Sequence, residues 1–269
     1  MHHIHFTSFG SGFPLIILHG LFGSLDNWAT LARRFADHFH VLAYDARNHG
    51  RSFHDDEFTY AAMAEDLAEF MHSQNIARAH ILGHSMGGKT AMQFAATTPE
   101  RVGKLVVVDI SPGAYGNRHD AILEAMNAID PGSLRSRDEA DNALASGIPD
   151  HATRQFIMKN LARNERGGFR WKLNLPVLTA RYGETGRALP PGTRCDCPTL
   201  FVRGERSTYL TDDDMGMIAT MFPQSRLATI TGAGHWVHAD NPDALYGAVV
   251  QFLLEEPAHT GNTTGAGGS

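Results

Sequence analysis

A tight turn between an apolar segment and a helix-forming segment limits the folds open to this chain. Residues 79–82 are mostly apolar and run directly into Gly-His-Ser-Met-Gly-Gly at 83–88, after which a helix-like stretch continues to about residue 96. Glycines at 83 and 87 let the backbone turn so sharply that larger side chains there would collide. Such a turn presents Ser85 above the end of a buried strand, beside helix N-terminal amides that favour negative charge. The motif predicts a nucleophilic serine, and acyl transfer as its chemistry.

Apolar extended segments alternate with amphipathic segments along most of the chain. The extended segments are 4–9, 14–18, 40–44, 78–82, 104–109, 198–203 and 225–230, and the helix-like segments are near 27–36, 60–74, 87–97, 211–221 and 241–254. This alternation predicts an α/β fold with a mostly parallel central sheet flanked by helices. The carboxyl ends of parallel strands meet at one edge, so polar residues that follow the strands are expected to gather there.

The alternation has one long interruption, which predicts an inserted unit. Residues 112–198 contain several helix-like stretches and a return rich in proline and glycine. We interpret them as a helical cap inserted after the sixth strand, between core segments 1–111 and 199–257, where it would cover the nucleophile and exclude water. Residues 258–269 are expected to be a disordered tail. The apolar cap residues, each of which is more simply explained by packing than by substrate contact, are Met126, Phe156, Met158, Leu161 and Trp171.

The composition excludes several partners. A formal net charge of −6 in 269 residues provides no extended positive field, so nucleic acid is not expected. The apolar runs are far shorter than the roughly 20 residues of a membrane span, and no cleavable signal is recognised, so we expect a cytoplasmic protein without stable membrane insertion. Cys195 and Cys197 are one residue apart, too close for a relaxed disulfide, and are expected to be free thiols. The sequence does not indicate the oligomeric state.

Two further loops complete the expected site. The segment 19–23 follows the strand at 14–18, and its Leu21 amide, with the Met86 amide, is expected to hold an oxyanion. His235 follows the strand at 225–230 and is the expected general base, whereas His19 and His49 are expected to brace loops. The histidines near the N-terminus are interpreted as solvated side chains rather than metal ligands. We expect neither a metal nor another cofactor.

With these residues assembled, the chain resembles the α/β-hydrolase fold superfamily, and within it the YbfF esterase-like, ABHD11-like branch. The resemblance is carried by residues 19–28, 45–52, 83–89 and 232–238. It implies a carboxylesterase or acyl-thioester hydrolase without a cofactor, active on small-molecule esters of short to medium acyl chains through an acyl-enzyme. The alternatives are a carbon–carbon bond hydrolase or lyase on the same fold, and a non-catalytic ligand receptor.

The acid that would orient His235 is not where most α/β-hydrolases have it. Their pattern places an aspartate at the position of Ser207 in the turn 204–207. Asp109, at the end of the strand that follows the Ser85 turn along the chain, is expected to supply the missing acid. The simpler alternative is that Asp109 caps a turn. Asp212, Asp213 and Asp214 are rival acids, although they follow Thr211 as acidic residues follow a helix N-cap. Ser207 is expected either to join the network or to be an inert loop serine.

Overall fold

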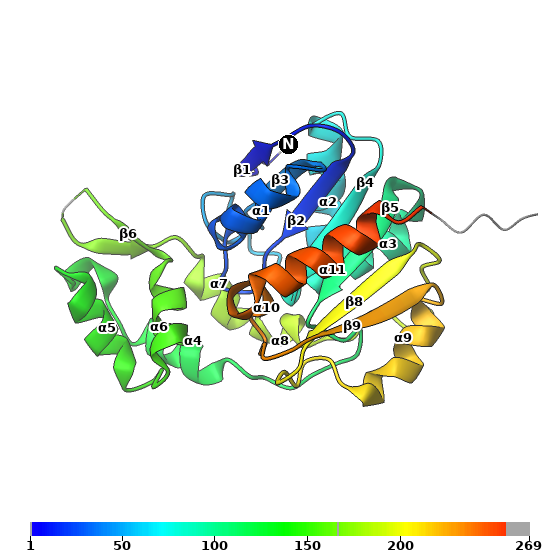
Figure 1. The fold of residues 1–269 in the computed structure, drawn as a ribbon. Helices are drawn as coiled ribbons and strands as arrows, with labels where there is room; N and C mark the ends of the chain where they lie inside the picture. The colour runs from blue at the N-terminus through cyan, green and yellow to red at the C-terminus, as the bar shows by residue number, and fades with distance from the viewer. Residues whose placement is uncertain (1, 166, 257–269) are drawn as a thin grey trace, which may run out of the picture.

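A seven-stranded, mostly parallel sheet forms the centre of the structure (Figure 1), a computed structural model that describes residues 2–165 and 167–256. The strand order is β1-β3-β2-β4-β5-β8-β9, and β1 alone pairs antiparallel, with β3. The strands are β1 (Phe6–Phe9), β2 (Pro14–Leu18), β3 (His40–Tyr44), β4 (Ala79–His84), β5 (Val102–Val108), β8 (Thr199–Gly204) and β9 (Ser225–Ile230). The predicted α/β fold with a mostly parallel sheet is confirmed.

Helices cover both faces of this sheet because successive side chains of each strand point to opposite faces. Ile16 and Val107 pack toward α2 and α3, whereas Ile17 and Val108 pack toward α1 and α11. The core helices are α1 (Ala29–Phe35), α2 (Tyr60–Ser73), α3 (Met86–Thr97), α9 (Met215–Met221), α10 (Val237–Asp240) and α11 (Pro242–Leu254), with short 3₁₀ turns η1 (Leu25–Trp28), η2 (Pro99–Arg101) and η4 (Asp212–Asp214).

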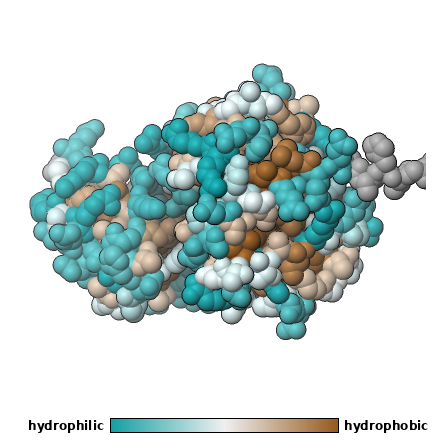
Figure 2. All heavy atoms as spheres, viewed as in Figure 1, coloured by the Kyte–Doolittle hydropathy of each residue, from teal (hydrophilic) through white to brown (hydrophobic). Residues whose placement is uncertain are grey.

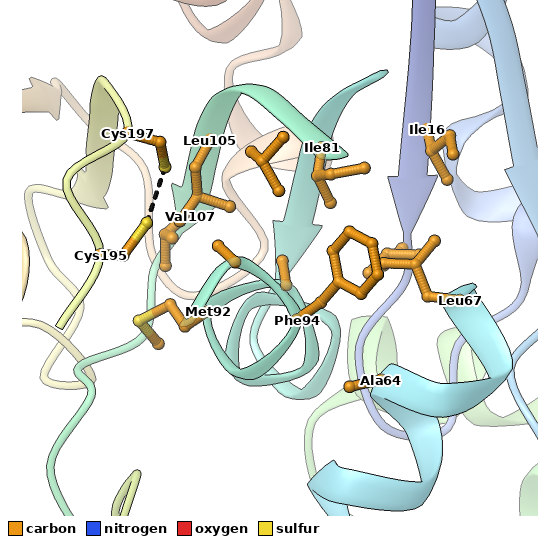
Figure 3. Close-up of a cluster of buried hydrophobic side chains, with 14 of the residues drawn as sticks. Ile16, Ala64, Leu67, Ile81, Met92, Phe94, Leu105, Val107, Cys195 and Cys197 are labelled. Atoms are coloured by element: carbon orange, nitrogen blue, oxygen red, sulfur yellow. Dashed lines mark hydrogen bonds between the residues drawn. The ribbon is translucent and has the colours of Figure 1, made fainter. Parts of the chain in front are cut away.

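The core on the α2 and α3 face is built from strand and helix side chains that meet directly. Figure 3 shows Ile81 and Leu105 from the sheet beside Phe94 and Met92 of α3. Cys195 and Cys197 border this core as free thiols, with their sulfur atoms 2.9 Å apart. The turn between β4 and α3 therefore rests on a largely apolar core.

The segment between β5 and β8 forms a lobe beside the sheet, with α4, α5 and α6 farthest out and α7 and α8 nearer the core (Figure 1). Its elements are α4 (Asp120–Asn127), η3 (Pro131–Ser133), α5 (Arg137–Ala145), α6 (His151–Met158), β6 (Leu161–Arg163), β7 (Phe169–Trp171), α7 (Leu175–Ala180) and α8 (Tyr182–Thr185). A separate apolar cluster holds this lobe together. We call the lobe the cap.

The structure corrects two details of the sequence prediction. The cap follows β5, the fifth strand in chain order rather than the sixth, because residues 2–13 supply a single strand before the parallel strands begin. The cap also contains a hairpin of β6 and β7, whereas the sequence predicted a helical cap. The backbone of Asn164 donates to the carbonyl of Gly168 at 2.9 Å, and Gly167 adopts a φ of 85°, which closes the turn between β6 and β7.

The outer surface is mainly hydrophilic in the view of Figure 2, with apolar atoms in separate patches. Among the described residues, no helix is both long and apolar enough to cross a membrane. The tail predicted at 258–269 lies outside the described residues, and the boundaries 1–111, 112–198 and 199–257 stay a prediction.

Candidate active site

Ser85 occupies a strained turn between β4 and α3. Its backbone angles, a φ of 53° and a ψ of −117°, lie in a region that residues other than glycine rarely adopt. Its amide donates to the Val108 carbonyl at 3.0 Å. A Cβ added to Gly83 would lie 2.1 Å from the Gly87 carbonyl oxygen, and one added to Gly87 would lie 2.4 Å from the Leu18 carbonyl oxygen. The glycines are therefore required by close backbone approach, as the sequence motif predicts.

Three side chains from different loops form one hydrogen-bonded chain. His235 Nε2 lies 3.0 Å from Ser85 Oγ, and His235 Nδ1 lies 2.7 Å from Asp109 Oδ2. Asp109 follows β5 directly and is completely buried. All three residues follow strands at their carboxyl ends, so the parallel sheet brings them together. The arrangement has the geometry of a serine, a base and an acid that orients the base.

Asp109 has hydrogen-bond donors besides His235. The Gly204 amide donates to Oδ1 at 2.9 Å, and the Ser207 hydroxyl donates to Oδ2. The turn at 204–207, which lacks an aspartate, thus supplies two donors to the aspartate of the neighbouring strand. Ser207 therefore joins the network through Asp109 rather than through a hydrogen bond to His235.

The rival acids have other partners. Asp212 forms an ion pair with Arg203 at 2.6 Å, and Asp214 accepts from the Ser111 hydroxyl at 2.6 Å and caps η4 through Thr211. Asp213 belongs to the same short turn and is exposed. Of the candidate acids, the structure brings Asp109 to His235.

Burial sets the charge state of this chain of residues. It lowers the pKa of His235 to about 3, with further contributions from His119 and Arg118. The imidazole is therefore neutral near pH 7, and a proton on Nδ1, directed at Asp109, leaves the lone pair of Nε2 facing the serine hydroxyl. Burial also raises the pKa of Asp109 to about 7, and the hydrogen bonds from Ser207 and Gly204 oppose that rise. Those donors favour the carboxylate form.

The loop at 19–23 is braced from both sides, as expected for His19 and His49. His19 donates to the Gly20 carbonyl at 2.8 Å and accepts from the Ala46 amide at 3.0 Å. His49 accepts from the Phe22 amide at 3.3 Å. Because the Phe22 amide is engaged, the preceding amide in the loop is the better candidate for an oxyanion donor.

That preceding residue, Leu21, lines the same pocket as Ser85. Met86 is the first residue of α3, where a backbone N–H has no acceptor within the helix. The structure thus brings both predicted oxyanion residues to the site, and their amide roles stay a proposal.

A pocket opens in front of the serine. The core loops and the cap both supply its lining, which includes His19, Gly20, Leu21, Phe22, Trp28, His84, Ser85, His119, Ile122, Phe156, Ile157, His235, Trp236 and His238. Of the apolar cap residues named from the sequence, Phe156 lines this pocket. Met126, Met158 and Leu161 are buried in the cap cluster, and Trp171 packs against it.

Sequence reasoning missed an aromatic residue that covers the base. Tyr209 stacks on the ring of His235, with centroids 3.8 Å apart and planes at 19°, and the Arg118 guanidinium lies 4.2 Å from the centre of the Tyr209 ring. The available signal was the position of Tyr209, two residues beyond Ser207 in the same turn. Among residues 2–165 and 167–256, no group of three or more His, Cys, Asp or Glu side chains suits a metal ion.

Comparison with known proteins identifies the family of this chain. Residues 14–242 match the family model described as alpha/beta hydrolase fold. The chain is 38% identical to Esterase YbfF of Escherichia coli over 242 residues, which cover 89% of this chain and 92% of that protein. It is 39% identical to the sn-1-specific diacylglycerol lipase ABHD11 of Mus musculus over 249 residues, which cover 89% and 80% of the two chains.

A solved structure is similar over almost the same length. The marine microorganism esterase is 42% identical, with a TM-score of 0.91, and the match covers 94% of this chain and all of that one. The chain therefore belongs to the α/β hydrolase fold family, in its YbfF- and ABHD11-like branch, and is a hydrolase of the esterase and lipase type.

Proposed function

We propose that this protein hydrolyses carboxylic esters, and acyl thioesters, of short to medium acyl chains through an acyl-enzyme on Ser85. The observation that carries the proposal is the unbroken hydrogen-bonded chain from Ser85 through His235 to Asp109. Its setting in a pocket walled by apolar side chains of the core and the cap supports an acyl group as the bound part of the substrate. The esterase and lipase names of the relatives agree with it.

In the first half of the reaction, His235 Nε2 takes the proton of the Ser85 hydroxyl while Oγ attacks the carbonyl carbon. The oxyanion is held by the amides of Leu21 and Met86. The bond from carbon to the leaving oxygen or sulfur then breaks, and His235 returns the proton to the leaving alcohol or thiol. The products are the acyl-enzyme and the first small molecule.

In the second half, His235 takes a proton from water, and the hydroxide attacks the same carbonyl carbon. The bond to Ser85 Oγ breaks, the serine recovers its proton from His235, and the carboxylic acid leaves. Asp109 holds the Nδ1 proton of His235 in both halves, and Ser207 helps to keep Asp109 ionised. Each residue therefore performs the same task twice.

The test is hydrolysis of p-nitrophenyl esters of increasing acyl length by wild type, Ser85→Ala, Asp109→Asn and Asp212→Asn, each checked for folding. We expect kcat to fall on the order of 10⁶-fold for Ser85→Ala and about 10⁴-fold for Asp109→Asn. Asp212→Asn is the matched control, because its carboxylate pairs with Arg203 away from His235, and it should keep its activity. Folded wild type that hydrolyses none of these esters would favour a lyase or a receptor instead.

A further inference from the structure

Lys89 is a fully buried lysine one helical turn beyond Ser85. Its side chain has no exposed surface, and its backbone amide donates to the Ser85 carbonyl at 3.0 Å. A buried ammonium is costly unless its donors are matched. Its Nζ donates to the carbonyls of Gly113, at 2.6 Å, and Arg187, and lies 4.9 Å from the centre of the Tyr115 ring. Burial lowers the pKa of Lys89 to about 8.

The two carbonyls belong to opposite ends of the cap. Gly113 lies on the segment that leaves the core after β5, and Arg187 lies on the segment that returns after α8. These segments are bonded to each other, because the Tyr115 amide donates to the Gly186 carbonyl and the Leu189 amide donates to the Pro112 carbonyl, each at 2.9 Å. We call residues 112–115 and 186–189 the neck of the cap. One ammonium thus binds both sides of the neck.

A further attachment lies beside Lys89, at residue 185, which directly precedes the returning segment of the neck. The Tyr60 hydroxyl, from α2, donates to the Thr185 carbonyl at 2.7 Å, and the ring of Tyr60 lies 5.9 Å from Lys89 Nζ. Among the described residues, Lys89 Nζ donates its hydrogen bonds to backbone carbonyls rather than to a carboxylate. An apolar side chain of similar length would fill this space but would leave both carbonyls without their donor.

We propose that Lys89 is a positioning residue that fixes the cap over the nucleophile and thereby sets the acyl lengths that the pocket accepts. Ser85 is the N-cap of α3 and Lys89 lies one turn into the helix, so the serine and the neck are held to one element. The cap supplies Ile122, Phe156 and Ile157 to the pocket wall. A loosened neck moves that wall relative to Ser85. The effect on acyl length rests on the proposed ester hydrolysis, whereas the attachment of the neck does not.

The chain offers a matched control in Lys104. Its Nζ also donates to backbone carbonyls, those of Phe252 at 2.8 Å, Leu253 at 3.2 Å and Glu255, and lies 5.2 Å from the centre of the Phe252 ring. These partners lie at the C-terminal end of α11 and do not belong to the neck. Lys104→Met therefore removes a lysine of the same bonding type without touching the cap.

The experiment measures amide hydrogen exchange by mass spectrometry in wild type, Lys89→Met, Lys89→Gln and Lys104→Met. We expect peptides containing the Tyr115 and Leu189 amides to exchange about tenfold faster or more in Lys89→Met, and to be unchanged in Lys104→Met. Lys89→Gln, which keeps an amide donor, should be intermediate, and it carries the test if Lys89→Met does not fold. Unchanged exchange in a folded Lys89 variant overturns the proposal.

Steady-state kinetics on acetyl and octanoyl esters supply the second readout. The ratio of kcat/KM between octanoyl and acetyl esters should change about fivefold or more in Lys89→Met, mainly through KM for the octanoyl ester, and should stay constant in Lys104→Met. An unchanged ratio contradicts the role in selectivity. If wild type hydrolyses neither ester, the proposed function fails, and the exchange data still decide whether Lys89 holds the neck.

Discussion

Ser207 illustrates how a single hydroxyl can tune the acid of this site. Its hydrogen bond to Asp109 lowers the pKa of a carboxyl that burial raises to about 7. Asp109 must be ionised to hold the Nδ1 proton of His235, so activity falls as the pH drops through the pKa of Asp109. The position of the acid limb of the pH–rate profile therefore reports on this hydrogen bond.

Ser207→Ala should shift that acid limb to higher pH by about one unit, because a charge-assisted hydrogen bond is lost and the pKa of Asp109 rises. The measurement is kcat/KM between pH 5 and 9. Ser207→Thr keeps a hydroxyl and should leave the limb close to that of wild type. An Ala variant with an unmoved limb would show that the hydroxyl does not act on Asp109.

Tyr209 should matter through its ring rather than its hydroxyl. The ring stacks on His235 and limits the orientations open to the imidazole. Tyr209→Ala should lower kcat by about 3- to 10-fold, the worth of one aromatic stack, while Tyr209→Phe should differ little from wild type. Equal losses in the two variants would assign the effect to the hydroxyl, which lies 3.4 Å from His119 Nε2.

The sequence identified Ser85 and His235 as candidates because each belongs to a local motif next to an apolar strand. Asp109 needed a further argument, since its position opposite His235 depends on neighbouring strands of the sheet. The position of Tyr209 near Ser207 places it close to the site, but its stacking on His235 depends on how the turn after β8 folds over the loop after β9. Local patterns specify local geometry, and contacts between loops require the assembled sheet.

At the scale of elements, the core strands in the structure agree within a few residues with the apolar segments of the sequence. Parallel strands buried on both faces consist almost entirely of apolar residues, so they are easily recognised. The cap was harder to predict. Its strands β6 and β7 have three residues each, too few to show an alternating pattern, and their pairing depends on the turn at 164–168. The helix α10, of four residues, also carries no periodic signal.

Substitutions of two cap residues should distinguish a residue that contacts substrate from one that only packs the cap. Phe156 lines the pocket and its ring lies 5.3 Å from that of Trp236, so Phe156→Ala should raise KM for long acyl esters with little change for acetate. Met126 is completely buried in the cap cluster, so Met126→Ala should lower stability by about 2–5 kcal/mol. Kinetics and chemical denaturation of both variants provide the test, and a reversed pattern would contradict these assignments.

At the scale of the whole molecule, buried neutral histidines make the fold sensitive to acid. Burial lowers the pKa of His49, His84 and His235 to about 3, and of His80 and His119 to about 4. Below pH 6.5 the unfolded chain binds protons that the folded chain does not, so stability is lost as the pH falls toward these values. The contribution of Asp109 to the pH dependence of stability has the opposite sign, because its raised pKa makes the folded state bind a proton at a higher pH than the unfolded state does.

Burial also lowers the pKa of His19 and His238, whereas Asp66 is the other aspartate whose pKa burial raises, so the histidines outnumber these aspartates and predict a net loss of stability on acidification. Each histidine contributes up to about 1.4 kcal/mol per pH unit below 6.5. Thermal unfolding at pH 7.5, 6.5, 5.5 and 4.5 should give a Tm that is nearly constant above pH 6.5 and falls steeply below it. A Tm that stays level down to pH 4.5 would mean that these histidines are not held neutral.

The most direct test of the central claim is to trap the acyl-enzyme. Wild type is mixed with p-nitrophenyl acetate, quenched in acid within the first turnovers, digested and analysed by mass spectrometry. The account predicts one acetyl group on the peptide that contains Ser85, with none on that peptide in Ser85→Ala. Turnover of the ester with the acetyl group on another residue, or an equally active Ser85→Ala, would contradict a serine hydrolase at this site.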